Sequence, residues 1–240
     1  MSGSPTTSPR GRATATRSSP PSSPGLAYSS ERIRGARGTL VDQRHLDRRR
    51  LAPLPEGLDP DAARSWTAEQ TAALREEWGE DWSAEAEVVI PALLRGGLER
   101  RREEDALAFQ LWLGRRPLCL FVHVAIGARD PQQRLPGPGD GVLFDSPSLG
   151  PGVLVPRYDD VGDSTAVGFD VVFACEDDAL VLVSVEPTLA DLLGLASPSI
   201  QSFIGSLELT GPDGRVRRAL PPALLEAQPE NTWIDSLSRP

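Results

Sequence analysis

The sequence contains no lysine, so all 25 of its basic residues are arginine, and its single methionine is at position 1. This bias is typical of coding sequence from a GC-rich bacterium, actinobacterial in type, and indicates no particular chemistry. In such genomes the DNA upstream of a gene often reads as an open frame. The composition therefore leaves open a translation start further downstream, in which case residues 1–40 would not belong to the native protein.

Cysteine and histidine are also scarce, with two of each. Cys119 and Cys175 lie in strand-like apolar runs, where a buried thiol behaves as a small hydrophobe, and this favours free thiols over a disulfide. The paired Cys or His spacings of zinc sites are absent. The sequence also lacks G-x-S-x-G, H-E-x-x-H, a Walker loop and a G-x-G-x-x-G after a strand. We therefore expect no metal, no cofactor and no enzymatic activity.

Long hydrophobic runs are missing too. No run approaches the ~18 apolar residues of a membrane span, and the N-terminal residues contain no apolar core of a secretory signal. The sequence therefore predicts a cytoplasmic protein without a membrane span.

Charge is distributed unevenly along the chain. Residues 1–50 contain ten arginines and three acids, whereas residues 51–240 contain 15 arginines and 31 acids. Because phosphate binding depends on clustered positive charge, nucleic acid is excluded as the main ligand of the acidic part and stays open only for the basic segment. Residues 1–60 are rich in Ser, Pro and Arg, and we expect a disordered tail and linker there.

Nearly all strand-like sequence lies in one block between Pro117 and Leu209. We expect strands over residues 118–126, 142–145, 153–158, 166–174 and 180–185, the last two forming a hairpin across the acidic turn CEDDA. Residues 61–210 are therefore predicted to form a single α+β domain, followed by a C-terminal extension over residues 211–240. Its core is an antiparallel β-sheet of about five to six strands with helices on both faces, an α/β/α sandwich. A small hairpin is expected around Pro212–Gly214.

Three helical segments are expected around this sheet. Thr67 and Gln70 match a capping box, which predicts a helix over residues 68–78 that ends at Gly79. Residues 83–114 are predicted to be helical throughout, either kinked or split at Pro91 and the glycine pair 96–97, with Leu107, Leu111 and Trp112 on one apolar side. Residues 189–207 are predicted to form a last helix that is capped by Thr188 and restarted at Ser197 and Pro198.

His123 is the only histidine in the part of the chain expected to fold. It stands in a strand expected to be covered on both sides, which favours a packed, hydrogen-bonded side chain over a catalytic base, and the sequence names no partner for it. A pocket between the helix layer and the sheet would lie near Trp112, His123 and the Gly- and Pro-rich loop 127–141. Trp112, His123, Arg129 and Arg134 are therefore the candidate ligand-binding residues.

The order of elements resembles a known fold. A helix ending in WLG, a meander of antiparallel strands, and a strand ALVLVSVEP that leads into a helix ending FIGSLEL are similar to the α/β/α sandwich of the PsbP and Mog1-like proteins. The likeness covers residues 83–209. It implies a binding or accessory role, and it carries over no functional residue, because these families share a fold and not one activity.

Three functions remain open. The first is a non-catalytic accessory protein that holds a protein partner through a sheet edge, its loops or the basic arm. The second is a small-ligand-binding protein with the pocket described above. The third is an enzyme that uses His123.

Overall fold

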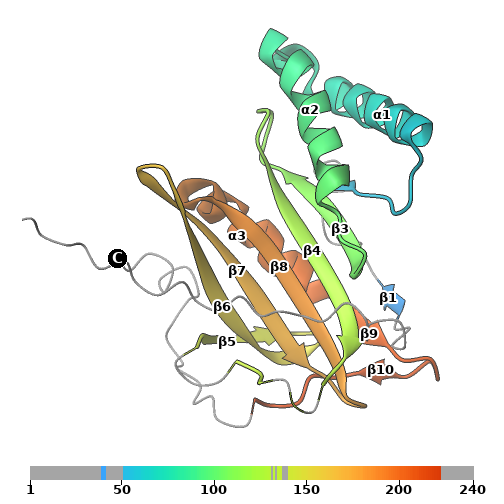
Figure 1. The fold of residues 1–240 in the computed structure, drawn as a ribbon, viewed down its shortest axis with the longest axis vertical. Helices are drawn as coiled ribbons and strands as arrows, with labels where there is room; N and C mark the ends of the chain where they lie inside the picture. The colour runs from blue at the N-terminus through green and yellow to red at the C-terminus, as the bar shows by residue number, and fades with distance from the viewer. Residues whose placement is uncertain (1–38, 42–50, 131, 133, 137–139, 223–240) are drawn as a thin grey trace, which may run out of the picture.

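The computed structural model describes residues 39–41, 51–130, 132, 134–136 and 140–222. Most of the tail and linker expected over residues 1–60, namely residues 1–38 and 42–50, lies outside the described residues, as do residues 223–240 of the C-terminal extension. In the described part the fold is α+β, with one antiparallel seven-stranded sheet, a smaller three-stranded sheet and three α-helices (Figure 1).

The large sheet has the strand order β2-β3-β4-β8-β7-β6-β5, and every neighbouring pair is antiparallel. Its strands are β2 (Leu51–Pro53), β3 (Asp105–Trp112), β4 (Cys119–Ala128), β5 (Val142–Ser146), β6 (Gly150–Val161), β7 (Ser164–Ala174) and β8 (Ala179–Leu189). The five strands expected from the sequence are confirmed, with ends that differ from the predicted ones by up to four residues. The expected count of five to six was wrong, because β2 lies in the segment interpreted as a linker and β3 in the segment interpreted as a helix.

The helical interpretation of residues 101–112 is the main error. Leu107 and Leu111 are four residues apart, which fits one side of a helix and equally one face of a strand. The helix instead ends at Arg100, and a tight turn follows in which Asp105 accepts a hydrogen bond from the backbone N–H of Arg102 at 2.9 Å. This turn reverses the chain into β3.

Two helices precede β3. Helix α1 (Pro60–Trp78) is capped by Asp59, whose carboxylate accepts hydrogen bonds from the N–H groups of residues 61 and 62, so the predicted cap at Thr67 was wrong. The Thr67 hydroxyl donates to the carbonyl of Ala63 inside the helix. The predicted end at Gly79, which has a positive φ of 54°, is confirmed. After a short 3-10 turn, η3 (Gly79–Asp81), helix α2 (Ala84–Arg100) starts at its cap Ser83 and runs on through Pro91.

Helix α3 (Ala190–Ser206) follows β8 directly. It is continuous, so the restart predicted at Ser197 was wrong, and the Ser197 hydroxyl donates back to the carbonyl of Leu193 within the helix. Thr188, predicted as the cap, is still part of β8.

The two hairpins predicted from the sequence are both present, and a further short strand pairs with one of them. The β7–β8 hairpin across the acidic turn is confirmed, and Asp177 and Asp178 adopt left-handed backbone conformations there, with φ near 57° and 55°, which aspartate tolerates in turns. The hairpin around Pro212–Gly214 is also confirmed, by the pairing of β9 (Glu208–Thr210) with β10 (Val216–Arg217). β1 (Thr39–Val41) pairs with the other side of β9.

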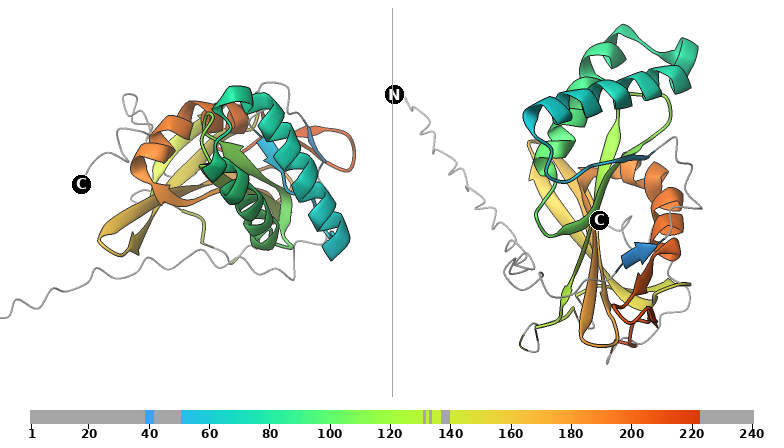
Figure 2. Two further views of the ribbon diagram at one scale, coloured as in Figure 1. Left: turned by 90° about the horizontal axis from the view of Figure 1, so that it is seen from above. Right: turned by 90° about the vertical axis from the view of Figure 1, so that its right-hand side faces the viewer.

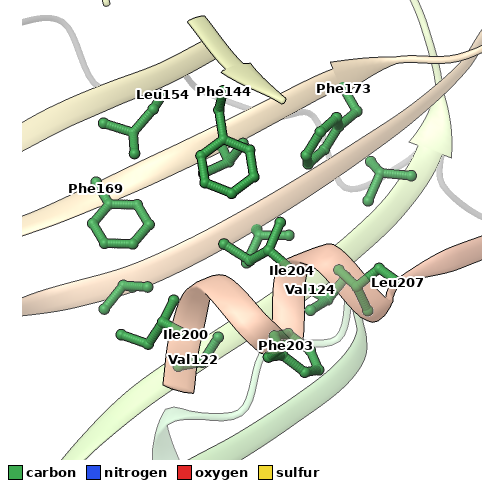
Figure 3. Close-up of a cluster of buried hydrophobic side chains, with 14 of the residues drawn as sticks. Val122, Val124, Phe144, Leu154, Phe169, Phe173, Ile200, Phe203, Ile204 and Leu207 are labelled. Atoms are coloured by element: carbon green, nitrogen blue, oxygen red, sulfur yellow. The ribbon is translucent and has the colours of Figure 1, made fainter. Parts of the chain in front are cut away.

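The two largest apolar cores of the described residues lie against the large sheet. The α3-side core contains Phe203, Ile204 and Ile200 from α3 together with alternate residues of the strands, such as Val122 and Val124 (Figure 3). Leu111 belongs to the same core. The α2-side core contains Trp78 from α1, Ile90 and Leu94 from α2, and Trp112. Each large apolar side chain buried in these cores stabilises the fold by roughly 1.5–3 kcal/mol.

The neighbours Leu111 and Trp112 belong to different cores, because successive side chains of a strand point to opposite faces. Helices α1 and α2 pack with residues of β2, β3 and β4. Figures 1 and 2 show both helices at the β3–β4 end of the molecule, away from β5, β6 and β7.

Candidate functional site: a polar row across the sheet

A row of polar side chains crosses the sheet on the α2 side. His123 belongs to this row and lies in the middle of β4, and its side chain is only 2% exposed. Its Nδ1 lies 2.7 Å from Oδ2 of Asp105 on β3, and its Nε2 lies 3.2 Å from Oε1 of Glu186 on β8. The imidazole is therefore held between carboxylates from the two neighbouring strands.

A β-bulge brings Asp105 to this face. Leu107 pairs with Val124, but Asp105 pairs with Ala125, which leaves Ala106 as an extra residue in β3. Without the extra residue, strict alternation would place Asp105 on the α3 side with Leu107. The bulge turns the side chain of Asp105 to the α2 side, so that its carboxylate reaches His123.

A second bulge lies beside Glu186. Val167 pairs with Thr188 and Phe169 with Val185, so that Gly168 alone faces the two residues Glu186 and Pro187. A Cβ atom at Gly168 would lie 2.5 Å from the carbonyl oxygen of Val185 and 2.8 Å from the nitrogen of Pro187. Only glycine fits against the backbone of β8 where Glu186 turns toward His123.

Arg100, the last residue of α2, completes the network. Its guanidinium donates to Oε2 of Glu186 at 2.8 Å and lies 4.4 Å from the ring centroid of Phe121. The end of α2 is thereby tied to β8, across β4.

These contacts shift two pKa values. Burial lowers the pKa of His123, but its hydrogen bonds to Asp105 and Glu186 outweigh burial and raise the pKa above the ordinary 6.5. Burial raises the pKa of Glu186, but the hydrogen bond to His123 and the charge of Arg100 outweigh it and lower the pKa below 4.5. Each ring nitrogen of His123 thus lies within hydrogen-bond distance of a carboxylate oxygen.

The row continues toward the far edge of the sheet. Ser184 on β8 is the cross-strand neighbour of both His123 and Asp170. Its hydroxyl donates to Oδ1 of Asp170 on β7 at 2.6 Å, and a guanidinium nitrogen of Arg157 on β6 lies 3.5 Å from the same oxygen. We call Asp105, His123, Ser184, Asp170 and Arg157 the polar row; they come from β3, β4, β8, β7 and β6, which are consecutive in the sheet.

The four residues proposed from the sequence do not form one site. Trp112 is buried against Trp78, with ring centroids 6.4 Å apart, and pairs with Cys119 four positions along β4 from His123. Arg129 follows the other end of β4, about 20 Å from His123 at the usual rise of a strand. Arg134 is exposed and forms an ion pair with Asp140 at 3.2 Å. Of the four, only His123 belongs to the polar row.

The sequence contained a signal for the rest of the row. Asp170 in GFDVVF, Ser184 in LVSVE and His123 in LFVHVAI are each a single polar residue inside an apolar strand. The hairpin expected between the first two strands brings Asp170 and Ser184 opposite each other. Asp105 could not be found, because its segment was interpreted as helical.

The two cysteines lie in different cores. Cys175 belongs to the α3-side core, and Cys119 packs against the α2-side core. Both thiols are free, and burial raises the pKa of each to about 12, so neither is a ready nucleophile near neutral pH. Within the described ranges no three His, Cys, Asp or Glu side chains group in a way that could hold a metal ion. No helix of that part is long and apolar enough to cross a membrane.

Comparison of the chain with protein-family models, with curated proteins and with solved structures finds no significant match.

Proposed function

We propose that the protein is a non-catalytic accessory protein that holds a protein partner at the open edge of its large sheet. One observation carries the proposal: β5 pairs only with residues 150–154 of β6, while β6 continues to Val161. Residues 155–161 of β6 therefore form a sheet edge that no described strand covers. Unpaired strand edges are ready templates for pairing with another chain.

Exposed apolar side chains stand on this edge. Tyr158 is 53% exposed and Val161 is 62% exposed. The paired ribbon of β6 and β7 presents both beside the turn that joins the two strands. Aromatic side chains are enriched in the contact surfaces of protein complexes.

The polar row supports a role in holding rather than in reacting. A general base needs a free nitrogen lone pair within reach of a substrate. His123 is buried, and each of its ring nitrogens lies within hydrogen-bond distance of a carboxylate oxygen. The row therefore acts as a tie across five strands that fixes their register.

Two further expectations belong to this proposal. The resemblance to the PsbP and Mog1-like α/β/α sandwich agrees with a binding role, and the packing of α3 and of α1 with α2 in separate cores supports it. The helix ending in WLG, on which the resemblance partly rests, is not present, because β3 ends at Trp112. The cytoplasmic location expected from the sequence, where a partner would be met, agrees with the two free thiols. The basic segment over residues 1–50 keeps nucleic acid open as a secondary contact.

A small-ligand-binding function is the second candidate, and it rests on buried polar atoms beneath α2. Oδ1 of Asp105, Oε1 of Gln110 and Nε1 of Trp112 have no hydrogen-bond partner among the described residues. Buried atoms of this kind are normally satisfied. A thermal-shift screen separates the two candidates, because a ligand that binds the folded state raises the unfolding midpoint with its concentration.

The main proposal is tested by site-specific photo-crosslinking in cells of the source organism. A photoreactive residue replaces Tyr158 in one variant and Val88 in the other; Val88 is 73% exposed on α2 and serves as the matched control. We expect one protein to crosslink to position 158 at high yield and not to position 88. Equal or absent crosslinking at both positions would contradict the proposal.

A further inference from the structure

Resting on the proposed function, we infer that the open edge of β6 takes an extended, arginine- or lysine-rich segment of the partner, which adds to the sheet as an antiparallel or parallel strand beside residues 155–161. Two features support this inference: the direction of the backbone groups and the charge of the edge.

The backbone of β6 offers free donors and acceptors. Pro156 pairs with Phe169 of β7 and has no N–H, so a proline fits there only where the backbone groups of that position point away from β7. Alternate residues of a strand direct their N–H and C=O groups to the same side. The N–H and C=O groups of Tyr158 and Asp160 therefore point out of the sheet, where an added strand would bind them.

The charge of the edge selects the occupant. Asp159, Asp160 and Asp163 are exposed, and the only cation beside them in β6, Arg157, pairs with Asp170. A second copy of the same edge would place these acids opposite each other, and like charges across a strand pair are destabilising. A cationic segment would instead pair with them.

The chain itself contains cationic sequence, with ten arginines in residues 1–50. If a segment of the same chain occupied the edge, the amides of Tyr158 and Asp160 would already be hydrogen-bonded in the free protein. Hydrogen exchange at these two amides therefore distinguishes an edge that is open to a partner from one that is filled.

The test uses the full-length protein and a blocked seven-residue peptide that alternates arginine and valine, with a glutamate–valine peptide of the same pattern as the control. We expect fast exchange at Tyr158 and Asp160 in the free protein. On addition of the cationic peptide, we expect saturable NMR shifts centred on residues 155–161 and slowed exchange at the same two amides. The glutamate–valine peptide is expected to give neither.

Two charge variants sharpen the result. Asp159→Asn with Asp160→Asn should weaken peptide binding about fivefold, the factor for two exposed charge pairs. Glu69→Gln with Glu76→Gln removes the same charge from the exposed side of α1 and should leave the affinity unchanged. Unfolding midpoints are measured for both variants, so that loss of folding is not mistaken for loss of binding.

Slow exchange at Tyr158 and Asp160 in the free protein would overturn the inference, as would shifts away from residues 155–161 or equal weakening by both charge variants. A partner that crosslinks at position 158 while the peptide fails to bind would leave the proposed function standing and overturn only the cationic strand. If neither the crosslink at position 158 nor binding of the peptide is observed, the proposed function and the inference are both overturned.

Discussion

His123 shows how a single side chain can join three strands through its polar contacts. Its imidazole lies between Asp105 and Glu186, and Glu186 is also bound by Arg100. A buried charge is tolerated only when it is paired. Removal of one member of such a group leaves the others buried without a partner, which costs more than the pair contributes.

This network predicts how stability depends on pH. The pKa of His123 is raised in the folded state, so its contribution is fully present below 6.5 and is lost as the pH rises through the raised value. The pKa of Glu186 is lowered, so its contribution is fully present above 4.5 and is lost as the pH falls through the lowered value. We expect the network to stabilise the fold most between pH 4.5 and 6.5. Denaturant unfolding across this pH range measures how the unfolding free energy changes with pH.

The variant His123→Ala provides the control for that prediction. It leaves Asp105 buried without its charge partner, and we expect a loss of about 3–5 kcal/mol of unfolding free energy at pH values within this window. The loss should shrink as the pH rises above the raised pKa of His123. A loss that is the same at every pH would show that the imidazole is held as a neutral ring.

At the scale of the element, two β-bulges decide which side chains meet. The bulge at Ala106 reverses the direction of Asp105, and the bulge opposite Gly168 lies where Glu186 leaves the regular ladder. Bulges that redirect a side chain are over-represented at functional sites. Here both bulges lie next to a carboxylate that contacts His123.

The bulge at Gly168 predicts a contrast between two glycine substitutions. Gly168→Ala would bring a methyl group to within 2.5 Å of a backbone oxygen of β8, and we expect a loss of about 1–3 kcal/mol. In Gly194→Ala, the control, nothing lies within 4 Å of the new methyl group in the exposed part of α3, and we expect a gain of about 0.5–1 kcal/mol. Thermal unfolding of both variants measures the difference.

Equal stabilities of these two variants would mean that β8 shifts to accept the methyl group. In that case the NMR signals of the His123 ring should change in Gly168→Ala, because Glu186 would move with the strand.

Secondary structure was predicted correctly from the sequence where the apolar residues fit only one type of element. The hairpin of β7 and β8 consists of two apolar, β-branched runs on either side of an acidic turn, which predicts the pairing of the strands but not the register shift at Gly168. The prediction for β3 was wrong because the spacing of Leu107 and Leu111 fits both a helix and a strand. Its polar residues Asp105 and Gln110 also resemble the solvent-facing side of a helix. Asp105 and Gln110 are in fact buried beneath α2. Their burial depends on tertiary packing, which a single sequence does not show.

At the scale of the whole molecule, strand order was the part that the sequence could not show. β4 and β8 are neighbours, although three strands lie between them in the chain. The contact of His123 with Glu186 depends on that pairing, so this part of the site was beyond any local pattern. The α+β class was accessible, because the strand block and the flanking helices each have a clear periodicity.

The arrangement of the cores predicts the behaviour of both cysteines. Cys119 and Cys175 lie in separate cores, so an intramolecular disulfide would require the sheet to open. A rise of the thiol pKa from 9.0 to about 12 lowers the thiolate fraction roughly a thousandfold at mildly alkaline pH. We expect iodoacetamide to leave both thiols unmodified in the native protein and to modify both in denaturant, as measured by intact mass. Rapid modification of one thiol in the native protein would reveal local opening around it.

Helix α3 comes after all seven strands of the large sheet in the chain. While the ribosome is making the protein, helix α3 therefore cannot cover the apolar surface of the sheet until residue 206 has been added. At the usual speed of translation this last stretch takes roughly one to three seconds, long compared with collapse of a chain. A product that stalls or is cut before Ala190 would expose the face that Phe203 and Ile204 normally cover, and it would be a natural substrate for chaperones and proteases.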